Sequence, residues 1–473
     1  MLARNGCYVG QSRLIITLSL SPLAVQHQYS STSAISGNES AVNANAIKSP
    51  TPAAAAPIHF AQQRKGAGGR ASFSGNVITV FGANGRLGQG LVNRLAKFGN
   101  QLIIPYRCDP YWVRDLKISG DLGQILFFPF NLKDDEAIRK AVKFSNVVVN
   151  LIGTRVNTKN FSMYDTHEHG ARRIARISRE MGVQRLIHLS AMGADPDYKS
   201  VMIKNAHFLR SKGLGELAVR DEFPNATIIR PSIMYGEYDE FIYPYLTYIR
   251  KNPLDWIKVY KCGEETFKMP IFLGDVSMGI NKAIMDPTSA GKTYDFVGPH
   301  NYRLADLFDF MYAKARVIRR LGFTYSRHDH FDPYFAFLKL VMQVWGKVFR
   351  KHTKINMEWL EFVEASTDYL TGNPTIGDLG VTHLTEFENM GGHHCLLNSF
   401  IRSFEERYLE LDVEPPLPVR APPIFKGQPL PASRPTTLSQ RYLLAHLVTS
   451  LIRSQFQGRV DDDRSYPRSL GYE

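Results

Sequence analysis

Short apolar runs alternate with amphipathic segments along residues 76–236. The runs are almost continuous in Val, Ile, Leu and Phe, as expected for strands that are covered on both faces. Between them, residues 134–144 and 166–181 have helical spacing. Alternating strands and helices predict an α/β fold with a doubly wound parallel sheet. The predicted strands are residues 77–81, 101–107, 124–128, 146–153, 185–191 and 226–236.

A glycine-rich turn joins the first predicted strand to the first predicted helix. The strand runs directly into Gly82, Gly85 and Gly88, and leucines at helical spacing follow. Gly82 permits a sharp turn, Gly85 lets backbone N–H groups approach a pyrophosphate, and Gly88 lets the helix pack against the strand. The helix N-terminus adds free N–H groups and a positive dipole end. This context predicts a dinucleotide site; the alternative is a glycine turn that only packs.

The end of the second predicted strand indicates which nucleotide binds. An NAD site usually has Asp or Glu there, on the ribose 2′-hydroxyl. Here the strand ends in Arg107, and no acid precedes Asp109. A guanidinium binds a phosphate through two charge-assisted hydrogen bonds, and Arg86 in the turn offers a second cation. We therefore expect NADP(H) in preference to NAD(H); the alternative is that both arginines are ordinary exposed residues.

The glycine spacing and a later strand resemble the extended and atypical short-chain dehydrogenase/reductases. The turn at 82–88 has the spacing G-x-x-G-x-x-G, and residues 226–236 have the Arg-Pro…Tyr-Gly ending of the family's sixth strand. The resemblance covers about residues 76–300. It implies a Rossmann-type fold and a catalytic set of Ser, Tyr and Lys.

The catalytic set is incomplete in this sequence. Ser190 and Lys212 match the family's Ser and Lys, but Phe208 stands four residues before Lys212, where the family has Tyr. None of the 22 tyrosines is followed by Lys four residues later. Phenylalanine carries no exchangeable proton, so acid–base catalysis loses its usual group. His207 points about 100° away on a helix, and Tyr198 is distant in sequence. We predict a nucleotide-binding fold with no catalytic residues.

Residues 1–75 predict a mitochondrial presequence and a flexible lead-in. The first 70 residues contain one acid, Glu39, against six Lys and Arg, and are rich in Ser and Ala, as in transit peptides. The apolar stretch 14–25 is too short to span a bilayer. A secretory signal is the alternative. Four scattered cysteines without metal-binding or paired spacing favour a reducing compartment and no metal site.

The C-terminal third predicts a small basic α-rich domain at 301–412 and a Pro-rich linker and tail at 413–473. Residues 301–360 carry eleven Lys and Arg against five Asp and Glu. Within them, the aromatic and Lys-bearing segment 334–349 fits a helix on a partner or beside anionic headgroups, or a core helix. The net charge of +13 suits an acidic partner or a membrane surface. No nucleic-acid motif accompanies the charge, so we expect no nucleic-acid partner.

Further blocks resemble the family of NADPH-binding accessory subunits of mitochondrial complex I, NADH:ubiquinone oxidoreductase, over about residues 76–382. The resemblance implies a non-catalytic subunit that lies peripherally on the matrix side of the inner membrane, near the quinone region. It also implies other complex I subunits as partners, and a tightly bound NADPH that takes no part in electron transfer. The blocks are residues 81–88, 103–109, 120–124, 146–153, 158–161 and 378–380.

The expected cofactor contacts come from the glycine turn and from the ends of the strands. The turn holds the pyrophosphate, Arg107 with Arg86 holds the 2′-phosphate, and Lys212 lies at the nicotinamide end. Two alternatives remain: an atypical NADP-dependent reductase or isomerase acting on a quinone, lipid or sugar derivative, and a scaffold whose site is empty. The full set is Gly82, Ala83, Asn84, Gly85, Arg86, Leu87, Gly88, Arg107, Asn131, Leu132, Leu151, Ile152, Gly153, Ser190, Lys212, Pro231 and Ile233. Asn131 departs from the Asp typical of the family.

Overall fold

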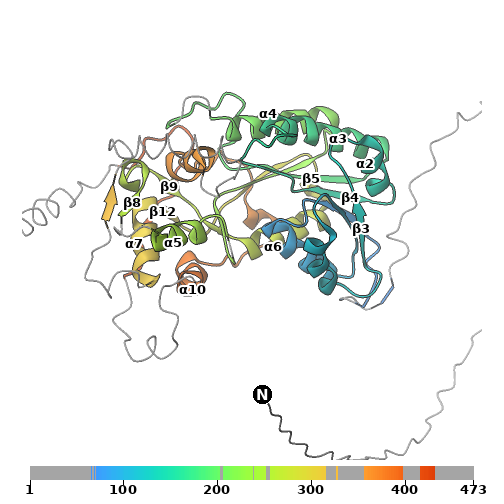
Figure 1. The fold of residues 1–473 in the computed structure, drawn as a ribbon, viewed down its shortest axis with the longest axis horizontal. Helices are drawn as coiled ribbons and strands as arrows, with labels where there is room; N and C mark the ends of the chain where they lie inside the picture. Colours follow the sequence, from blue (N-terminus) through green and yellow to red (C-terminus); the bar gives the residue numbers. More distant parts are fainter. Residues whose placement is uncertain are drawn as a thin grey trace, which may run out of the picture. The chain divides into compact units, whose positions relative to one another are not determined.

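A parallel sheet of seven strands, in the order β11-β6-β5-β4-β1-β2-β3, forms the centre of the computed structural model (Figure 1). Every neighbouring pair in it is parallel, so the predicted doubly wound α/β fold is confirmed. The strands are β1 (Val77–Phe81), β2 (Gln101–Tyr106), β3 (Ile125–Pro129), β4 (Val147–Asn150), β5 (Arg185–Leu189), β6 (Thr227–Pro231) and β11 (Thr293–Phe296). The structure describes residues 65–66, 69, 71–202, 206–237, 239–251, 256–315, 326–328, 356–397 and 416–431.

Helices cover both faces of the sheet. On one face α1 (Arg86–Lys97) packs against α6 (Leu273–Met285). On the other, α2 (Asp135–Val142), α3 (Gly170–Glu180) and α4 (Phe208–Glu222) pack side by side (Figure 1). The buried faces of α1, α2 and α3 are mostly apolar, as expected for amphipathic helices that cover a sheet. A π-helical turn, η3 (Asp165–His169), precedes α3 and accounts for the start of the helix predicted at 166–181.

The strand order places a switch point between β1 and β4. After β3 the chain returns across the sheet, so β1 lies between β2 on one side and β4 on the other. Ligands of open α/β sheets bind at such a point, beyond the carboxyl ends of the strands. The glycine turn at 82–88 follows β1 and opens α1 at this place.

A second hydrophobic core lies beyond the carboxyl ends of the strands. Its members include Phe208, Tyr245, Phe308, Trp359 and Phe387. These side chains come from both sides of residue 300, so the predicted domain boundary there stays a prediction. The helical elements that contribute are α4, α5 (Ile242–Lys251), α7 (Leu304–Ala315), α9 (Met357–Leu360), η6 (Glu361–Ala365), η8 (Phe387–Gly391) and α10 (Gly392–Leu397).

Three small sheets of two or three short strands lie outside the seven-stranded sheet. The described part of the predicted Pro-rich linker, residues 416–431, includes β14, which pairs antiparallel with β12. The presequence up to residue 64 and the segment 334–349 lie outside the described residues. Within those residues no helix has the length and apolarity needed to cross a membrane. The short pairs are β7 (Met234–Tyr235) with β10 (Ile271–Phe272), β12 (Asn301–Arg303) with β9 (Phe267–Lys268) and β14 (Arg420–Ala421), and β8 (Trp256–Lys258) with β13 (Ser326–His328).

Candidate nucleotide-binding site

The glycine turn has the geometry that a phosphate cradle requires. Gly82 has φ +80, and its carbonyl accepts from the N–H of Gly85 at 3.1 Å. A Cβ on Gly88 would lie 2.6 Å from Ala83 Cα and from the Gly82 carbonyl oxygen, so α1 packs tightly on the turn only because Gly88 has no side chain. No side chain caps the N-terminus of α1, and its first turn contains no acid. Its N–H groups are therefore available to an anion.

Two cavities meet at this turn, and both are lined by Gly82, Gly85, Leu151 and Gly153. One, of about 560 Å³, runs toward β6 and α4. The other, of about 300 Å³, runs toward the ends of β2 and β3. A dinucleotide with its pyrophosphate at the turn would extend one half into each. All but one of the predicted contact residues line one or both cavities.

Asn131 is the exception: it lines neither cavity, and its contact with the nucleotide stays a prediction. It lies exposed at the surface, and its side-chain oxygen accepts the N–H of Lys133 at 3.2 Å. The reason is local: β3 ends at Pro129, and Asn131 begins a tight turn in which its carbonyl accepts the N–H of Asp134 at 3.0 Å. The next residue, Leu132, lines the smaller cavity.

Arg107 is the charged residue of the smaller cavity. Its guanidinium lies 5.2 Å from the centre of the Phe161 ring, and within the described residues no Asp or Glu lines this cavity. Arg86 lines the larger cavity instead. Arg86 opens α1 whereas Arg107 follows β2, and the two side chains line different cavities that meet at the glycine turn. Their shared contact with one phosphate therefore stays a prediction.

Lys212 and Ser190 lie together in the larger cavity, where the sequence places the nicotinamide. The Lys212 ammonium is buried and donates to the Leu189 carbonyl at 3.0 Å. Burial, with a smaller effect of the Arg155 charge, lowers the pKa of Lys212 to about 8. The buried Ser190 hydroxyl has no hydrogen-bond partner among the described residues. A Cβ on Gly153 would lie 3.2 Å from the Lys212 Nζ, so a residue without a side chain makes room for the amine.

The position of the missing hydroxyl is filled by an aromatic ring. Phe208 is buried at the start of α4 and packs edge-on against the rings of His167, at 5.6 Å, and Phe362, at 5.5 Å. Within the described residues no tyrosine lines the larger cavity. Tyr198, the tyrosine considered above as a replacement for the missing catalytic one, is not in this cavity. Its hydroxyl donates to Glu361 at 3.1 Å, and the residue lines a different cavity.

His167 is neutral at this end of the cavity. The Thr154 N–H donates to its Nε2 at 3.0 Å, and its Nδ1 lies 2.8 Å from the Ser211 hydroxyl, which donates to the Phe208 carbonyl. Since Nε2 accepts, the ring proton is on Nδ1. Burial lowers the pKa of His167 well below its usual value, and the nearby Lys212 charge lowers it further. His167 therefore adds no cation beside Lys212.

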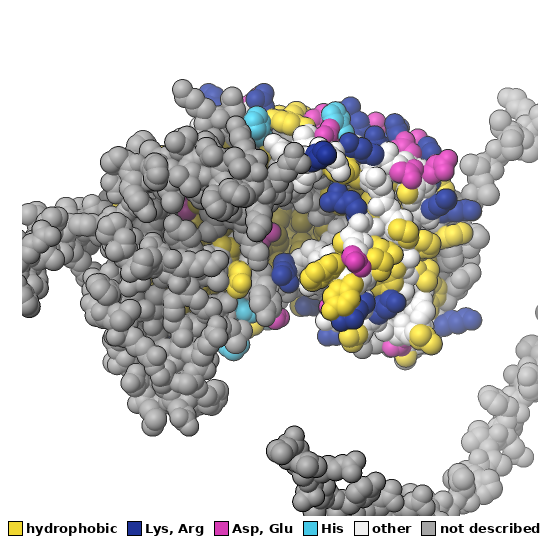
Figure 2. All heavy atoms as spheres, in the orientation of Figure 1, with side chains coloured by type: hydrophobic (Ala, Val, Ile, Leu, Met, Phe, Trp, Pro, Cys, Tyr) yellow, Lys and Arg dark blue, Asp and Glu magenta, His cyan; other side chains and the backbone are white. Residues whose placement is uncertain are grey.

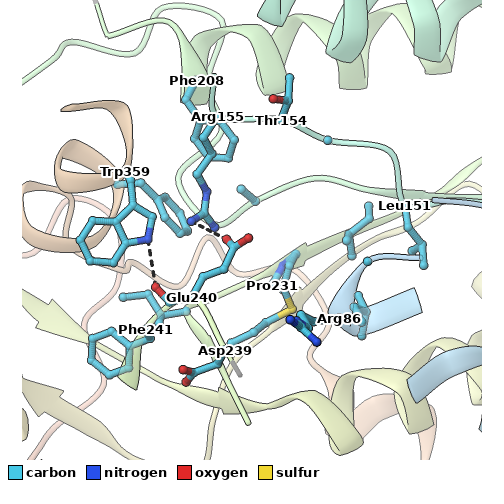
Figure 3. Close-up of a pocket in the computed structure, with 18 of the residues that line it drawn as sticks. Arg86, Leu151, Thr154, Arg155, Phe208, Pro231, Asp239, Glu240, Phe241 and Trp359 are labelled. Atoms are coloured by element: carbon cyan, nitrogen blue, oxygen red, sulfur yellow. Dashed lines mark hydrogen bonds and ion pairs between the residues drawn. The ribbon is translucent and has the colours of Figure 1, made fainter. Parts of the chain in front are cut away.

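The far wall of the larger cavity comes from residues that the sequence analysis missed. The Arg155 guanidinium makes a 2.6 Å ion pair with Glu240, and the Trp359 indole N–H donates to the Glu240 carbonyl at 3.0 Å (Figure 3). The Asn356 amide donates to the Arg155 carbonyl at 2.6 Å. Trp359 and Asn356 belong to a segment more than 100 residues beyond the sheet motifs, and no local pattern connects them.

Comparisons with known proteins find one matching family model, several relatives in sequence and similar solved structures. Residues 82–242 match the NAD(P)H-binding family model named NAD_binding_10. The chain is 40% identical to the mitochondrial NADH dehydrogenase [ubiquinone] 1 alpha subcomplex subunit 9 of Mus musculus, over 68% of this chain and 81% of that protein. It is 32% identical to the protein of the same name in Dictyostelium discoideum, over 67% of this chain and 83% of that one. A solved terminal R domain from the myxalamid PKS-NRPS biosynthetic pathway aligns with 72% of this chain and 92% of its own at 15% identity, with a TM-score of 0.49.

The chain carries the NAD(P)H-binding fold, and two relatives above 30% identity are each covered over more than two thirds of their length. It therefore belongs to the family of mitochondrial NADH dehydrogenase [ubiquinone] 1 alpha subcomplex subunit 9.

Proposed function

We propose that this chain is an accessory subunit of mitochondrial complex I that holds one NADPH as a structural group and transfers no hydride. A single observation carries the proposal: the larger cavity retains Lys212 and Ser190, while Phe208 fills the position of the proton-carrying hydroxyl. Such a cavity can bind a nicotinamide ribose through the lysine and the serine. It has no tyrosine among its described lining residues to move a proton.

The preference for NADPH is supported by the smaller cavity. Arg107 is a cation on its lining, and no carboxylate among the described residues is available there for a ribose 2′-hydroxyl. A guanidinium gains from a 2′-phosphate and gains little from a hydroxyl, whereas an NAD site would need the opposite arrangement. We place the contacts of the pyrophosphate at residues 82–88 and those of the nicotinamide end at Gly153, Ser190, Lys212 and 231–233.

The cellular setting follows from the family. The relatives are named as mitochondrial subunits of the NADH dehydrogenase that uses ubiquinone, so we infer a place on the matrix side of the inner membrane, among other complex I subunits and near the quinone region. Contact with anionic headgroups would come from the basic residues 301–360, most of which lie outside the described residues.

The decisive experiment identifies the bound nucleotide. The subunit, purified with the complex, is denatured and the released molecules are identified by mass spectrometry. We expect one NADPH per subunit. In parallel, the purified subunit is given NADPH with quinone, lipid and sugar-nucleotide acceptors, and we expect no oxidation. Turnover that disappears in Lys212→Ala would instead establish a reductase, and an empty site would leave only a scaffold.

A charge reversal tests the nucleotide preference. Arg107→Glu should lose NADPH affinity by at least about tenfold, because one charge-assisted contact contributes about 1.5–3 kcal/mol, and it should reduce the ratio of NADPH to NADH affinity. Lys140→Glu makes the same charge change on an exposed residue of α2 and serves as the control. Wild-type NADPH content and affinity in Arg107→Glu would refute the role given to Arg107.

A further inference from the structure

Large apolar side chains gather outside the edge of the sheet that β3 forms. They lie on the 3₁₀ helix η2 (Pro110–Ser119), on the turn after it and on β3 itself. Trp112 is 64% exposed and Ile118 81%. In Figure 2 apolar side chains cluster over this part of the described surface. Isolated exposed apolar residues are ordinary, whereas a contiguous group marks a contact surface. We name as the β3-edge surface the residues Tyr111, Trp112, Ile118, Leu122, Leu126 and Phe128.

The same edge has backbone groups that no described strand pairs. β3 is the last strand of the sheet, with β2 as its neighbour. The Gln124 carbonyl accepts from the Leu102 N–H, and the Phe130 N–H donates to the Tyr106 carbonyl, each at 2.9 Å. Even-numbered positions of this segment therefore face β2, and the backbone groups of Ile125 and Phe127 face outward, because they alternate along a strand.

Among the described residues, this edge has little of the protection usual in soluble proteins. Exposed edge strands normally carry charged side chains, bulges or a covering segment, because a free edge recruits other strands. The run 125–128 is Ile-Leu-Phe-Phe, with no charge and no polar residue. Pro129, the last residue of β3, has no N–H to donate, so the unpaired backbone groups end there. The edge is therefore suited to pair with one short strand.

Charge and composition indicate what kind of molecule would cover the surface. The charged residues beside this surface have no basic excess, in a chain of net charge +13, whereas a surface for anionic lipid would be basic. The Arg114 guanidinium lies 4.0 Å from the centre of the Tyr111 ring, and the Tyr111 and Trp112 rings meet edge-on at 5.7 Å. Trp, Tyr and Arg are the residues that dominate protein interfaces. The charged residues within 109–121 are Arg114 and Lys117 against Asp109, Asp115 and Asp121.

We propose that the β3-edge surface is an interface with another subunit of complex I, and that an extended apolar segment of that subunit pairs with β3 as an additional strand. Main-chain hydrogen bonds to Ile125 and Phe127 would fix its register, and its side chains would contact Trp112 and Leu126. The inference rests on the proposed place of the chain in complex I. It does not depend on the bound nucleotide.

Site-specific cross-linking in the assembled complex tests the proposal. A photoreactive amino acid replaces Leu122, and in a matched control it replaces Leu217, an exposed apolar residue of α4. We expect Leu122 cross-links to one extended segment of a single other subunit, found by mass spectrometry of the purified complex. Cross-links confined to residues 1–64 of the same chain, or to lipid, would overturn the proposal.

Variants of the surface give a second measurement. Trp112→Ala should weaken retention in the complex by about thirtyfold or more, as loss of an interface anchor does. Leu126→Lys should do the same by placing a charge beside the paired strand, whereas Leu217→Lys should not. The isolated variants should keep the wild-type melting temperature and NADPH content, which separates this outcome from a failure of the nucleotide site. Full retention of both surface variants would refute the interface.

Discussion

Lys212 is a buried cation whose charge the surrounding residues compensate only in part. Its ammonium donates to the Leu189 carbonyl, while burial and the charge of Arg155 lower its pKa from 10.5 to about 8, against an opposing effect of Glu216. The unfolded chain therefore binds more protons between pH 8 and 10.5, and stability rises with pH through that window. At pH 7 the cost of the buried charge is about 3 kcal/mol. Buried groups with strongly shifted pKa values are concentrated at functional sites, which agrees with a role for Lys212 in binding a ligand.

The substitution Lys212→Met should separate stability from binding. In the nucleotide-free protein it should raise the free energy of unfolding at pH 7, by up to about 3 kcal/mol, because the buried charge is removed. The same change should weaken NADPH binding, and the rise in stability between pH 8 and 10.5 should disappear. Urea unfolding and calorimetric titration measure the two effects. Lys140→Met on the exposed face of α2 is the control; a destabilised Lys212→Met would contradict the prediction.

At the scale of elements, the segment 356–365 holds the cavity wall in place through three glutamates. Glu358 accepts the N–H of Phe208 at 3.0 Å, at the start of α4. Glu361 accepts from the loop 198–202, and Glu364 accepts the Tyr245 hydroxyl of α5 at 2.6 Å. Because the glutamates are three residues apart, each carboxylate contacts a different part of the chain. Trp359 and Phe362, from the same segment, line the larger cavity.

Removing the central glutamate should loosen this wall. Glu361 is 1% exposed and accepts from the Val201 N–H at 2.6 Å, the Met202 N–H at 2.9 Å and the Tyr198 hydroxyl. Glu361→Ala would leave these donors unpaired, at about 1 kcal/mol or more each, so the free energy of unfolding should fall by about 3 kcal/mol or more. Glu361→Gln should lose less, and Glu136→Ala, on an exposed residue of α2, should lose almost nothing in the same urea titration.

Local patterns in the sequence predicted six of the seven strands, because these strands and the helices between them are contiguous in the chain. The edge strand β11 (Thr293–Phe296) was not predicted. The apolar runs, the glycine turn, Ser190 and Lys212 all belong to one unbroken stretch with family-like spacing. The segment 356–365 was missed because its contacts are distant in sequence: Glu358 meets Phe208 across 150 residues, and glutamates at spacing three fit any exposed helix. Asn131 lies outside both cavities because a tight turn after β3 keeps its side chain at the surface, so its contact with the nucleotide stays a prediction.

For the whole molecule, the larger cavity lies where the core of the sheet meets the second core. It is lined on one side by the glycine turn of the sheet and on the other by Trp359 and Phe362, which belong to the second core. A nucleotide in this position would contact both, so its binding energy would stabilise both together. A ligand present at a thousand times its Kd adds about 4 kcal/mol of stability if it binds only the folded state, a large share of what a domain has in total.

Loss of the nucleotide should therefore reduce both the stability of the subunit and the amount of assembled complex. We expect the nucleotide-free wild type to melt several degrees below the loaded protein, since 1 kcal/mol shifts a domain of 150–250 residues by about 2–4 °C. Added NADPH should restore the wild type, and should restore Arg107→Glu only at concentrations at least about tenfold higher. Scanning calorimetry gives the melting shift, and native gels of mitochondria expressing each variant give the assembled fraction. If Arg107→Glu contained no nucleotide yet assembled as fully as Lys140→Glu, NADPH would not be stabilising this subunit in the complex, because mass action requires the unloaded form to unfold more often and to be removed before it assembles.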